Sequence, residues 1–132
     1  QLDAVVVEGD RIGRTLGYPT ANLRAIGRRI LLPRTGVYAV RLRLPGGEWA
    51  DGAASLGWRP VFEGQDLRLE VYLFDREVDL YGRRVRLAWH GFVRDERNFD
   101  GVDALKAQMA ADCERARHIL SHTPTPDAAP SA

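Results

Sequence analysis

The sequence predicts one mainly β domain: a small closed antiparallel barrel followed by a single C-terminal helix. The length of 132 residues fits one domain, and 45% hydrophobic residues are enough for one core. Most periodic stretches are short, alternate between apolar and polar residues, and are joined by turns. Only the last third of the chain shows helical periodicity. This order argues against alternating βαβ units, and barrel closure would remove exposed sheet edges.

The N-terminal third predicts two strands separated by a long loop. Residues 4–7 (AVVV) form a short apolar run typical of a strand. Residues 8–22 contain three glycines and a proline without any periodic pattern, which predicts a long, shaped loop. Residues 36–44 alternate, and Arg41 and Arg43 lie on the polar side. That alternation predicts a half-buried strand.

The middle of the chain predicts two hairpins. A Pro-Gly-Gly turn at residues 45–47 leads back into residues 49–56, which can pair with the preceding strand. Residues 57–66 are expected to form a second irregular stretch. The alternating strand at residues 67–73 is then expected to turn back into a strand at residues 85–89.

Residues after position 100 predict one amphipathic helix. Asp100 can cap its start, and Asp103 favours the positive end of the helix dipole. Apolar residues recur at helical spacing: Val102, Leu105, Met109, Cys113, Ala116 and Leu120. Prolines and small residues at 121–132 predict a disordered tail, so the domain is expected to span residues 1–120.

Composition and charge exclude several classes of function. The 19 basic and 18 acidic residues leave a net charge of +1, so no overall field favours nucleic acid or an anionic membrane. Cys113 is the only cysteine, which excludes an internal disulfide and a Cys-rich zinc site and indicates a reducing cytoplasm. No run approaches the roughly 18 apolar residues of a membrane span. The chain starts without methionine and runs directly into a strand, which suggests a piece excised from a longer protein.

The glycines of the first loop could bring backbone amides close to a phosphate. Gly9, Gly13 and Gly17 do not have P-loop spacing, and Arg14 follows where that motif requires lysine. The dinucleotide-binding fingerprint also fails, because its spacing is absent and no helix follows. On spacing alone, an ordinary surface loop is favoured.

Thr20 and Asn22 lie two residues apart after Pro19, so in an extended chain both side chains point the same way. A hydroxyl and an amide oxygen are hard ligands, suited to a magnesium ion that takes its other ligands from water and phosphates. The alternative is a turn in which both side chains bond their own backbone. Spacing alone favours that alternative.

Two further groups are candidates for chemistry. Glu70 is the one carboxylate within an apolar and aromatic strand and could act as a general base. Its alternative role is an ion pair with Arg68 or a cross-strand arginine. Residues 94–99 (RDERNF) could line the mouth of a ligand site or form a solvated connection. Neither pattern is decisive, and the three histidines show no metal-ligand spacing.

Residues 13–22 (GRTLGYPTAN) resemble the signature loop of riboflavin kinases. Further segments similar to that family follow in its order: residues 36–38 (GVY), 57–60 (GWRP), 69–71 (LEV), 80–82 (LYG), 94–99 (RDERNF) and the final helix. The resemblance covers residues 5–120. It implies a six-stranded antiparallel barrel with a C-terminal helix, and transfer of the ATP γ-phosphoryl group to the 5′-hydroxyl of riboflavin, giving FMN.

The resemblance also implies roles for individual residues. Thr20 and Asn22 would hold Mg²⁺, with Mn²⁺ as an alternative, together with the phosphates. Glu70 would activate the ribityl hydroxyl. The residues expected to surround the nucleotide and the flavin are Gly13, Arg14, Gly17 and Pro19 in the loop, and Arg94, Glu96 and Phe99 in a flavin-side flap. Ser55 and Val61 depart from the family, which usually has Asn and Thr at these positions.

In bacteria the module that this chain resembles usually follows an FMN adenylyltransferase module, and the two form a bifunctional FAD synthetase. This chain alone is therefore expected to make FMN and not FAD. The alternative is a non-catalytic flavin- or nucleotide-binding regulatory module of the same fold. Retention of Thr20, Asn22 and Glu70 together favours the kinase. A nucleic-acid-binding barrel would need a basic excess and a row of stacking aromatics, which this sequence lacks.

Overall fold

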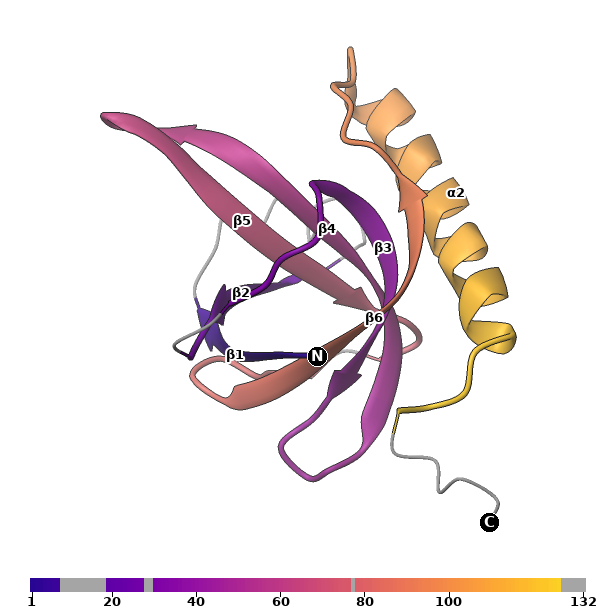
Figure 1. Cartoon of the computed structure of the whole chain (residues 1–132). Coiled ribbons are helices and arrows are strands. Elements are labelled where there is room, and N and C mark those ends of the chain that lie inside the picture. The colour runs from indigo at the N-terminus through magenta and orange to yellow at the C-terminus, as the bar shows by residue number, and fades with distance from the viewer. Residues whose placement is uncertain (8–18, 28–29, 77, 127–132) are drawn as a thin grey trace.

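The computed structural model describes residues 1–7, 19–27, 30–76 and 78–126. Within these residues the chain forms six strands and one long helix (Figure 1). The elements are β1 Leu2–Val7, β2 Ala21–Ala25, β3 Gly36–Arg43, β4 Trp49–Val61, β5 Gly64–Leu73, β6 Arg84–Arg94 and α2 Val102–Ser121. The strands close into an antiparallel barrel in the order β1-β2-β5-β4-β3-β6, which confirms the predicted fold class.

The strand order corrects one predicted hairpin. β3–β4 and β4–β5 are hairpins, but β5 pairs with β2 and β4, while β6 pairs with β1 and β3. The expected pairing of the strand at 67–73 with the strand at 85–89 is therefore wrong. Turn residues between two strands predict a change of direction, whereas the choice of partner depends on closure of the whole barrel.

The expected irregular stretch at residues 57–66 is also wrong, because β4 continues to Val61 and β5 begins at Gly64. Their ladder continues from Trp58 opposite Leu67 to Val61 opposite Gly64. The tight turn between them places Glu63 at a φ of 67° and Gly64 at a φ of 148°. The long hairpin projects from the barrel at the upper left of Figure 1.

Alternating side chains fill the barrel, as the strand patterns predict. The largest fully buried side chains are Leu42, Leu56, Leu87, Val40 and Val71. A second apolar cluster lies outside the barrel, under α2, and consists of Ala39, Ala53, Phe74, Ala116 and Leu120. β3, expected to be half-buried, is therefore buried on both faces, because α2 covers its outer side.

Close approach of α2 to the barrel depends on a glycine in β6. A Cβ atom on Gly91 would lie 2.7 Å from Cγ2 of Ile119, closer than two carbon atoms can approach without displacement. Absence of a side chain at this position lets the helix lie directly on the strand.

Arg41 was expected on a polar strand face, but its side chain is only 8% exposed. Its Nε atom donates to Oδ1 of Asp51 at 2.9 Å, and its Nη2 atom donates to the carbonyl oxygen of Leu120 at 2.9 Å. Its Nη1 atom donates to the carbonyl of Pro124 at 3.0 Å. These bonds satisfy a carbonyl at the helix end and anchor the start of the predicted tail. Residues 127–132 of that tail lie outside the described residues.

The helix begins at Val102 with Gly101 at the cap position, and no side chain of the described residues caps it. The predicted cap by Asp100 is therefore wrong, although Asp103 lies in the first turn as expected. Val102 is exposed, because only the C-terminal half of α2 packs tightly on the barrel. The N-terminal half instead faces the cleft described below.

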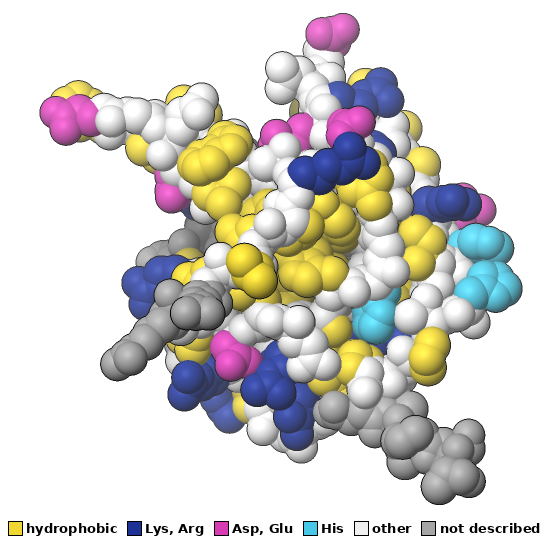
Figure 2. All heavy atoms as spheres, viewed as in Figure 1, with side chains coloured by type: hydrophobic (Ala, Val, Ile, Leu, Met, Phe, Trp, Pro, Cys, Tyr) yellow, Lys and Arg dark blue, Asp and Glu magenta, His cyan; other side chains and the backbone are white. Residues whose placement is uncertain are grey.

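The face of the molecule in Figure 2 has hydrophobic side chains gathered near its centre and charged side chains distributed around its rim. Acidic and basic groups both occur along that rim, in keeping with the near-zero net charge. In the part of the chain that the structure describes, no helix is long and apolar enough to cross a membrane.

Protonation of the half-buried His90 is expected to make stability depend on pH. His90 on β6 is half-buried, and its Nε2 atom has no hydrogen-bond partner among the described residues. Burial, and next the charge of Arg41, lower the pKa of His90 below 6.5. As the pH falls through 6.5, the unfolded chain binds a proton before the folded chain does, so the free energy of unfolding decreases.

We therefore expect the thermal midpoint to fall from about pH 7 to about pH 5, and to fall less in a His90→Gln variant. Thermal melts at several pH values test this. His118→Gln, which changes an exposed histidine, is the control. Its thermal midpoint should vary with pH as steeply as that of the parent protein. Equal slopes in the parent and His90→Gln would exclude His90 as the source.

Candidate functional site

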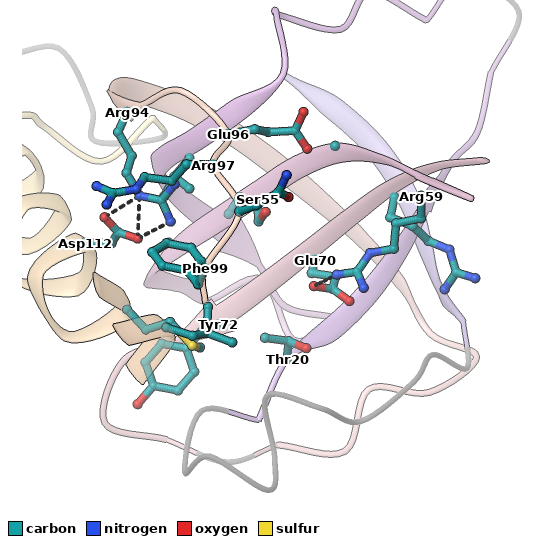
Figure 3. A pocket seen from close by; sticks show the side chains of 18 of the residues that line it. Thr20, Ser55, Arg59, Glu70, Tyr72, Arg94, Glu96, Arg97, Phe99 and Asp112 are labelled. Carbon is teal, nitrogen blue, oxygen red and sulfur yellow. Dashed lines mark hydrogen bonds and ion pairs between the residues drawn. The ribbon is translucent and has the colours of Figure 1, made fainter. Parts of the chain in front are cut away.

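A cleft of about 640 Å³ lies between the outer face of the barrel and the N-terminal half of α2, with residues 94–99 at its mouth (Figure 3). Volumes of this size are typical of small-molecule sites. The barrel lines it with Thr20, Val37, Ala53, Ala54, Ser55, Gly57, Trp58, Arg59, Pro60, Arg68, Glu70 and Tyr72. The other wall is Arg94, Glu96, Arg97, Asn98, Phe99, Leu105, Met109, Asp112 and Cys113.

Strand register brings the predicted polar residues into one row. Asn22 on β2 pairs directly with Glu70 on β5, and Glu70 pairs with Ser55 on β4. Residues directly opposite in an antiparallel ladder share a face, with Cβ atoms about 4.5–5.5 Å apart. An amide, a carboxylate and a hydroxyl therefore lie side by side. Ser55 and Glu70 line the cleft, as does Thr20 just before β2 begins, whereas Asn22 is not among its described lining residues.

Asn22 is only 7% exposed, although it lies on the outer face of the barrel. Its Oδ1 atom is buried and has no hydrogen-bond partner among the described residues. An unsatisfied buried acceptor costs roughly 1–3 kcal/mol, so such an atom requires an explanation. A hard cation would satisfy it, and Thr20 offers a second oxygen nearby. These two side chains fit the predicted magnesium site.

Glu70 lies on β5 with its side chain 14% exposed, on the same side of the cleft as Thr20 (Figure 3). Arg59 on the neighbouring strand donates from Nη2 to Oε2 of Glu70 at 3.1 Å. The predicted alternative, a pair with a cross-strand arginine, is thus present in this structure. Arg68 instead bonds Asp66 at 3.0 Å. Glu70 therefore lies in the cleft and is also ion-paired there.

Of the predicted flavin-side residues, Arg94 lies on the opposite side of the cleft from Thr20 and Glu70, whereas Glu96 reaches across to β4 (Figure 3). Arg94 forms an ion pair with Asp112 of α2, with Nη2 and Oδ2 2.9 Å apart. Phe99 is half-buried and lines the cleft, and the guanidinium carbon of Arg94 lies 5.5 Å from its ring centroid. Glu96 is exposed and lies over Gly57, where a Cβ atom would be 1.7 Å from its Oε1 atom. Only a glycine at position 57 permits this approach.

Sequence reasoning missed Asp112, which lines the cleft and is buried. A signal was present in the helix pattern, because Asp112 lies three residues after Met109 and four before Ala116. It therefore falls within the apolar stripe. A carboxylate on a buried stripe indicates a buried partner.

Other predicted site residues are not brought to the cleft by the described structure. Gly13, Arg14 and Gly17 lie outside the described residues. Pro19 is described next to Thr20 but is not among the described residues that line the cleft. Val61 is 44% exposed near the end of the β4–β5 hairpin, so of the two departures from the family only Ser55 lies in the cleft.

Cys113 is expected to be an unreactive thiol. Burial, and next the charge of Asp112, raise the pKa of Cys113 to about 11. Only the thiolate is nucleophilic, so alkylation by iodoacetamide near pH 8 should be roughly 100-fold slower in the folded protein than in denaturant. Mass spectrometry over time measures both rates. Equal rates would mean that the folded structure does not suppress the thiolate.

The closed antiparallel barrel presents the carboxylate of Glu70 and the hydroxyls of Thr20 and Ser55 to a cleft of the size of a small-molecule site, which is typical of an enzyme domain. The family model described as "Flavokinase: Riboflavin kinase" matches residues 1–120. The chain therefore belongs to the riboflavin kinase family, as its sequence predicts.

Relatives and a solved structure agree with this membership. The chain is 42% identical over 117 residues to the bifunctional riboflavin kinase/FMN adenylyltransferase of Listeria monocytogenes, covering 88% of this chain and 37% of the relative. It is 42% identical over 118 residues to the enzyme of the same name from Escherichia coli K12, and the match covers 89% of this chain and 37% of the relative. A crystal structure described as a macrolide-efflux protein from Streptococcus pneumoniae is 40% identical with a TM-score of 0.80, covering 88% and 38%. The chain thus spans less than two fifths of the length of these proteins.

Proposed function

We propose that this domain transfers the γ-phosphoryl group of ATP to the 5′-hydroxyl of riboflavin, giving FMN and ADP. The hydroxyl oxygen forms a bond to the γ-phosphorus, the bond to the bridging β–γ oxygen breaks, and the hydroxyl proton passes to Glu70. The observation that carries this proposal is the ladder row of Asn22, Glu70 and Ser55, in which Glu70 and Ser55 line the same cleft as Thr20. This row supports an assignment in which cation ligands lie next to a proton acceptor, an arrangement that suits phosphoryl transfer.

The nucleotide end of the site is assigned to Thr20 and Asn22. Their side-chain oxygens would hold Mg²⁺, with Mn²⁺ as an alternative, and the bound ion would neutralise charge on the ATP phosphates. The buried Oδ1 atom of Asn22, which has no hydrogen-bond partner in the described part of the chain, supports this assignment. Arg59, 3.1 Å from Glu70, adds a positive charge at the same end of the cleft.

The flavin end is assigned to the cleft wall formed by α2 and residues 94–99. Phe99, Tyr72, Leu105 and Met109 present aromatic and aliphatic surface there. Such surface suits a flat, largely apolar ring system, while the polar ribityl chain extends toward Glu70. A ligand in this orientation places its terminal hydroxyl near the proton acceptor.

We further propose that the domain belongs to a longer protein that also carries an FMN adenylyltransferase module. The lengths and names of the relatives support this, since each is bifunctional and the chain matches about 37% of each. The described cleft is assigned one reaction, so the isolated domain forms FMN without FAD. A reducing cytoplasm remains the predicted location.

The test is incubation of the purified domain with riboflavin, ATP and magnesium chloride, followed by chromatographic separation of flavins and nucleotides. We expect FMN and ADP in equal amounts, no FAD, and no product when EDTA removes the metal. Riboflavin binding without FMN formation would contradict the proposal and indicate a non-catalytic flavin-binding module. FAD formation would contradict the assignment of a single reaction.

A further inference from the structure

Buried polar side chains are costly unless they are paired, so each one requires a reason. Among the described residues, three polar or charged residues are buried: Asn22, Arg41 and Asp112. Arg41 holds the end of α2, and Asn22 is assigned to the metal. Asp112, in the middle of α2 and 6% exposed, has no role in the proposed chemistry.

Asp112 is the centre of a hydrogen-bond network between α2 and the end of β6. Arg94 donates from Nε to both carboxylate oxygens, at 2.9 Å to Oδ1 and 3.0 Å to Oδ2. Gln108, one turn earlier on the helix, donates from Nε2 to Oδ1 at 2.9 Å. Arg97 donates in turn to Oε1 of Gln108 at 3.2 Å. The helix thereby holds Arg94, the last residue of β6, and Arg97, in the connection between β6 and α2.

The same two arginines also lie beside Phe99, the aromatic residue of that connection. Their guanidinium carbons are 5.5 Å (Arg94) and 5.2 Å (Arg97) from the ring centroid of Phe99, a cation–π arrangement. Phe99 lines the cleft between the network and Tyr72 (Figure 3). Across the mouth, Glu96 lies against Gly57 of β4. The connection is thus held at the helix and rests on the barrel.

We propose that Asp112, supported by Gln108, is a positioning residue for the flavin. By orienting Arg94 it fixes residues 94–99, and with them the Phe99 ring, along the flavin side of the cleft. This inference rests on the proposed function, since it assigns that side to riboflavin. Figure 3 places Asp112 on the opposite side of the cleft from Thr20 and Glu70. Its loss therefore acts on riboflavin and leaves the nucleotide end unchanged.

The test compares Asp112→Asn with the parent domain in steady-state kinetics, varying riboflavin and ATP separately. The amide keeps the shape of the side chain but gives up one acceptor oxygen and the charge. We expect KM for riboflavin to rise about 10-fold or more, as for other residues that orient a ligand-contacting group, and KM for ATP to stay within about twofold. Glu114→Gln, an exposed carboxylate on the same helix, is the matched control and should behave as the parent.

A double variant separates positioning from folding. Arg94→Met with Asp112→Leu removes both charges and so avoids an unpaired buried ion. We expect Asp112→Asn to lower the thermal midpoint and the double variant to restore it to the value of the parent. The double variant should not restore the affinity for riboflavin. Recovery of both would overturn the proposal, because Asp112 would then matter only for stability.

Equilibrium binding of riboflavin, followed by quenching of its fluorescence, gives a readout independent of turnover. If the parent domain binds riboflavin but forms no FMN, the proposed kinase function fails while Asp112 is still tested by binding. Unchanged riboflavin affinity in Asp112→Asn would overturn the positioning role, as would equal rises in KM for riboflavin and ATP.

Discussion

Replacing Glu70 with glutamine is expected to lower kcat by about 100- to 10,000-fold, the usual cost of removing a general base. The glutamine side chain would keep the size of the original and its place opposite Asn22 and Ser55 in the ladder. It could not accept the hydroxyl proton. Riboflavin affinity should therefore stay within a few-fold of the parent, because the flavin ring is assigned to the other end of the cleft.

Single-turnover FMN formation, with riboflavin binding measured in parallel, separates the chemical step from affinity. Asp66→Asn is the matched control, since Asp66 is a carboxylate on the same strand that pairs with an arginine outside the proposed chemistry. A Glu70→Gln rate within a few-fold of the parent would remove Glu70 from the mechanism. An equal loss in Asp66→Asn would indicate a general effect of charge along β5.

Strand faces could be predicted from the sequence because they depend on local alternation. Leu69 and Val71 are apolar and Glu70 lies between them, so period-2 geometry alone directs Glu70 away from the core. The structure confirms this, with Leu69 and Val71 in the barrel core and Glu70 in the cleft. The barrel architecture could also be predicted from local patterns, because the sequence shows several short alternating strands and one terminal helix.

Pairings between distant segments could not be predicted in that way. Arg41 has the sequence signature of a solvated strand residue, yet its partners include the carbonyl of Leu120, 79 residues further along the chain. Asp112 is similar, because its partner Arg94 belongs to the preceding strand. A charged residue is buried only when tertiary structure brings a partner, and local periodicity contains no information about that partner.

Much of the candidate site was indicated by family resemblance and not by spacing. Thr20, Asn22 and Glu70 each had an ordinary structural alternative when considered one at a time. The structure adds the reason why they belong together: β2 and β5 are neighbours in the barrel, with Asn22 opposite Glu70. Strands distant in sequence become neighbours only when the barrel closes, so no local motif could show this adjacency.

The second large effect is expected from Asn22→Leu, which should separate stability from function. Leucine has a similar size and removes the buried Oδ1 atom that has no partner among the described residues. Replacing a polar group that is unsatisfied without ligand by an apolar group of similar shape is neutral or stabilising. We therefore expect the thermal midpoint of the ligand-free domain to be unchanged or higher.

The same substitution should remove a metal ligand and weaken the use of magnesium and ATP. We expect kcat/KM for MgATP to fall by about 100-fold or more, because misplaced phosphates lose their alignment with the hydroxyl. Riboflavin binding should be unchanged. Thr20→Val, which replaces the other oxygen ligand by a methyl group, should shift magnesium dependence in the same direction.

Two measurements test the prediction: initial rate as magnesium is titrated, and the thermal midpoint with and without MgADP. In the parent, a nucleotide that binds only the folded state raises the midpoint by mass action, and in Asn22→Leu this rise should be lost. Unchanged magnesium dependence in both variants would exclude the site at Thr20 and Asn22. A sharp fall in the ligand-free midpoint of Asn22→Leu would show instead that the amide already has a stabilising partner in the empty domain, and the strongest structural argument for a cation at this position would then be lost.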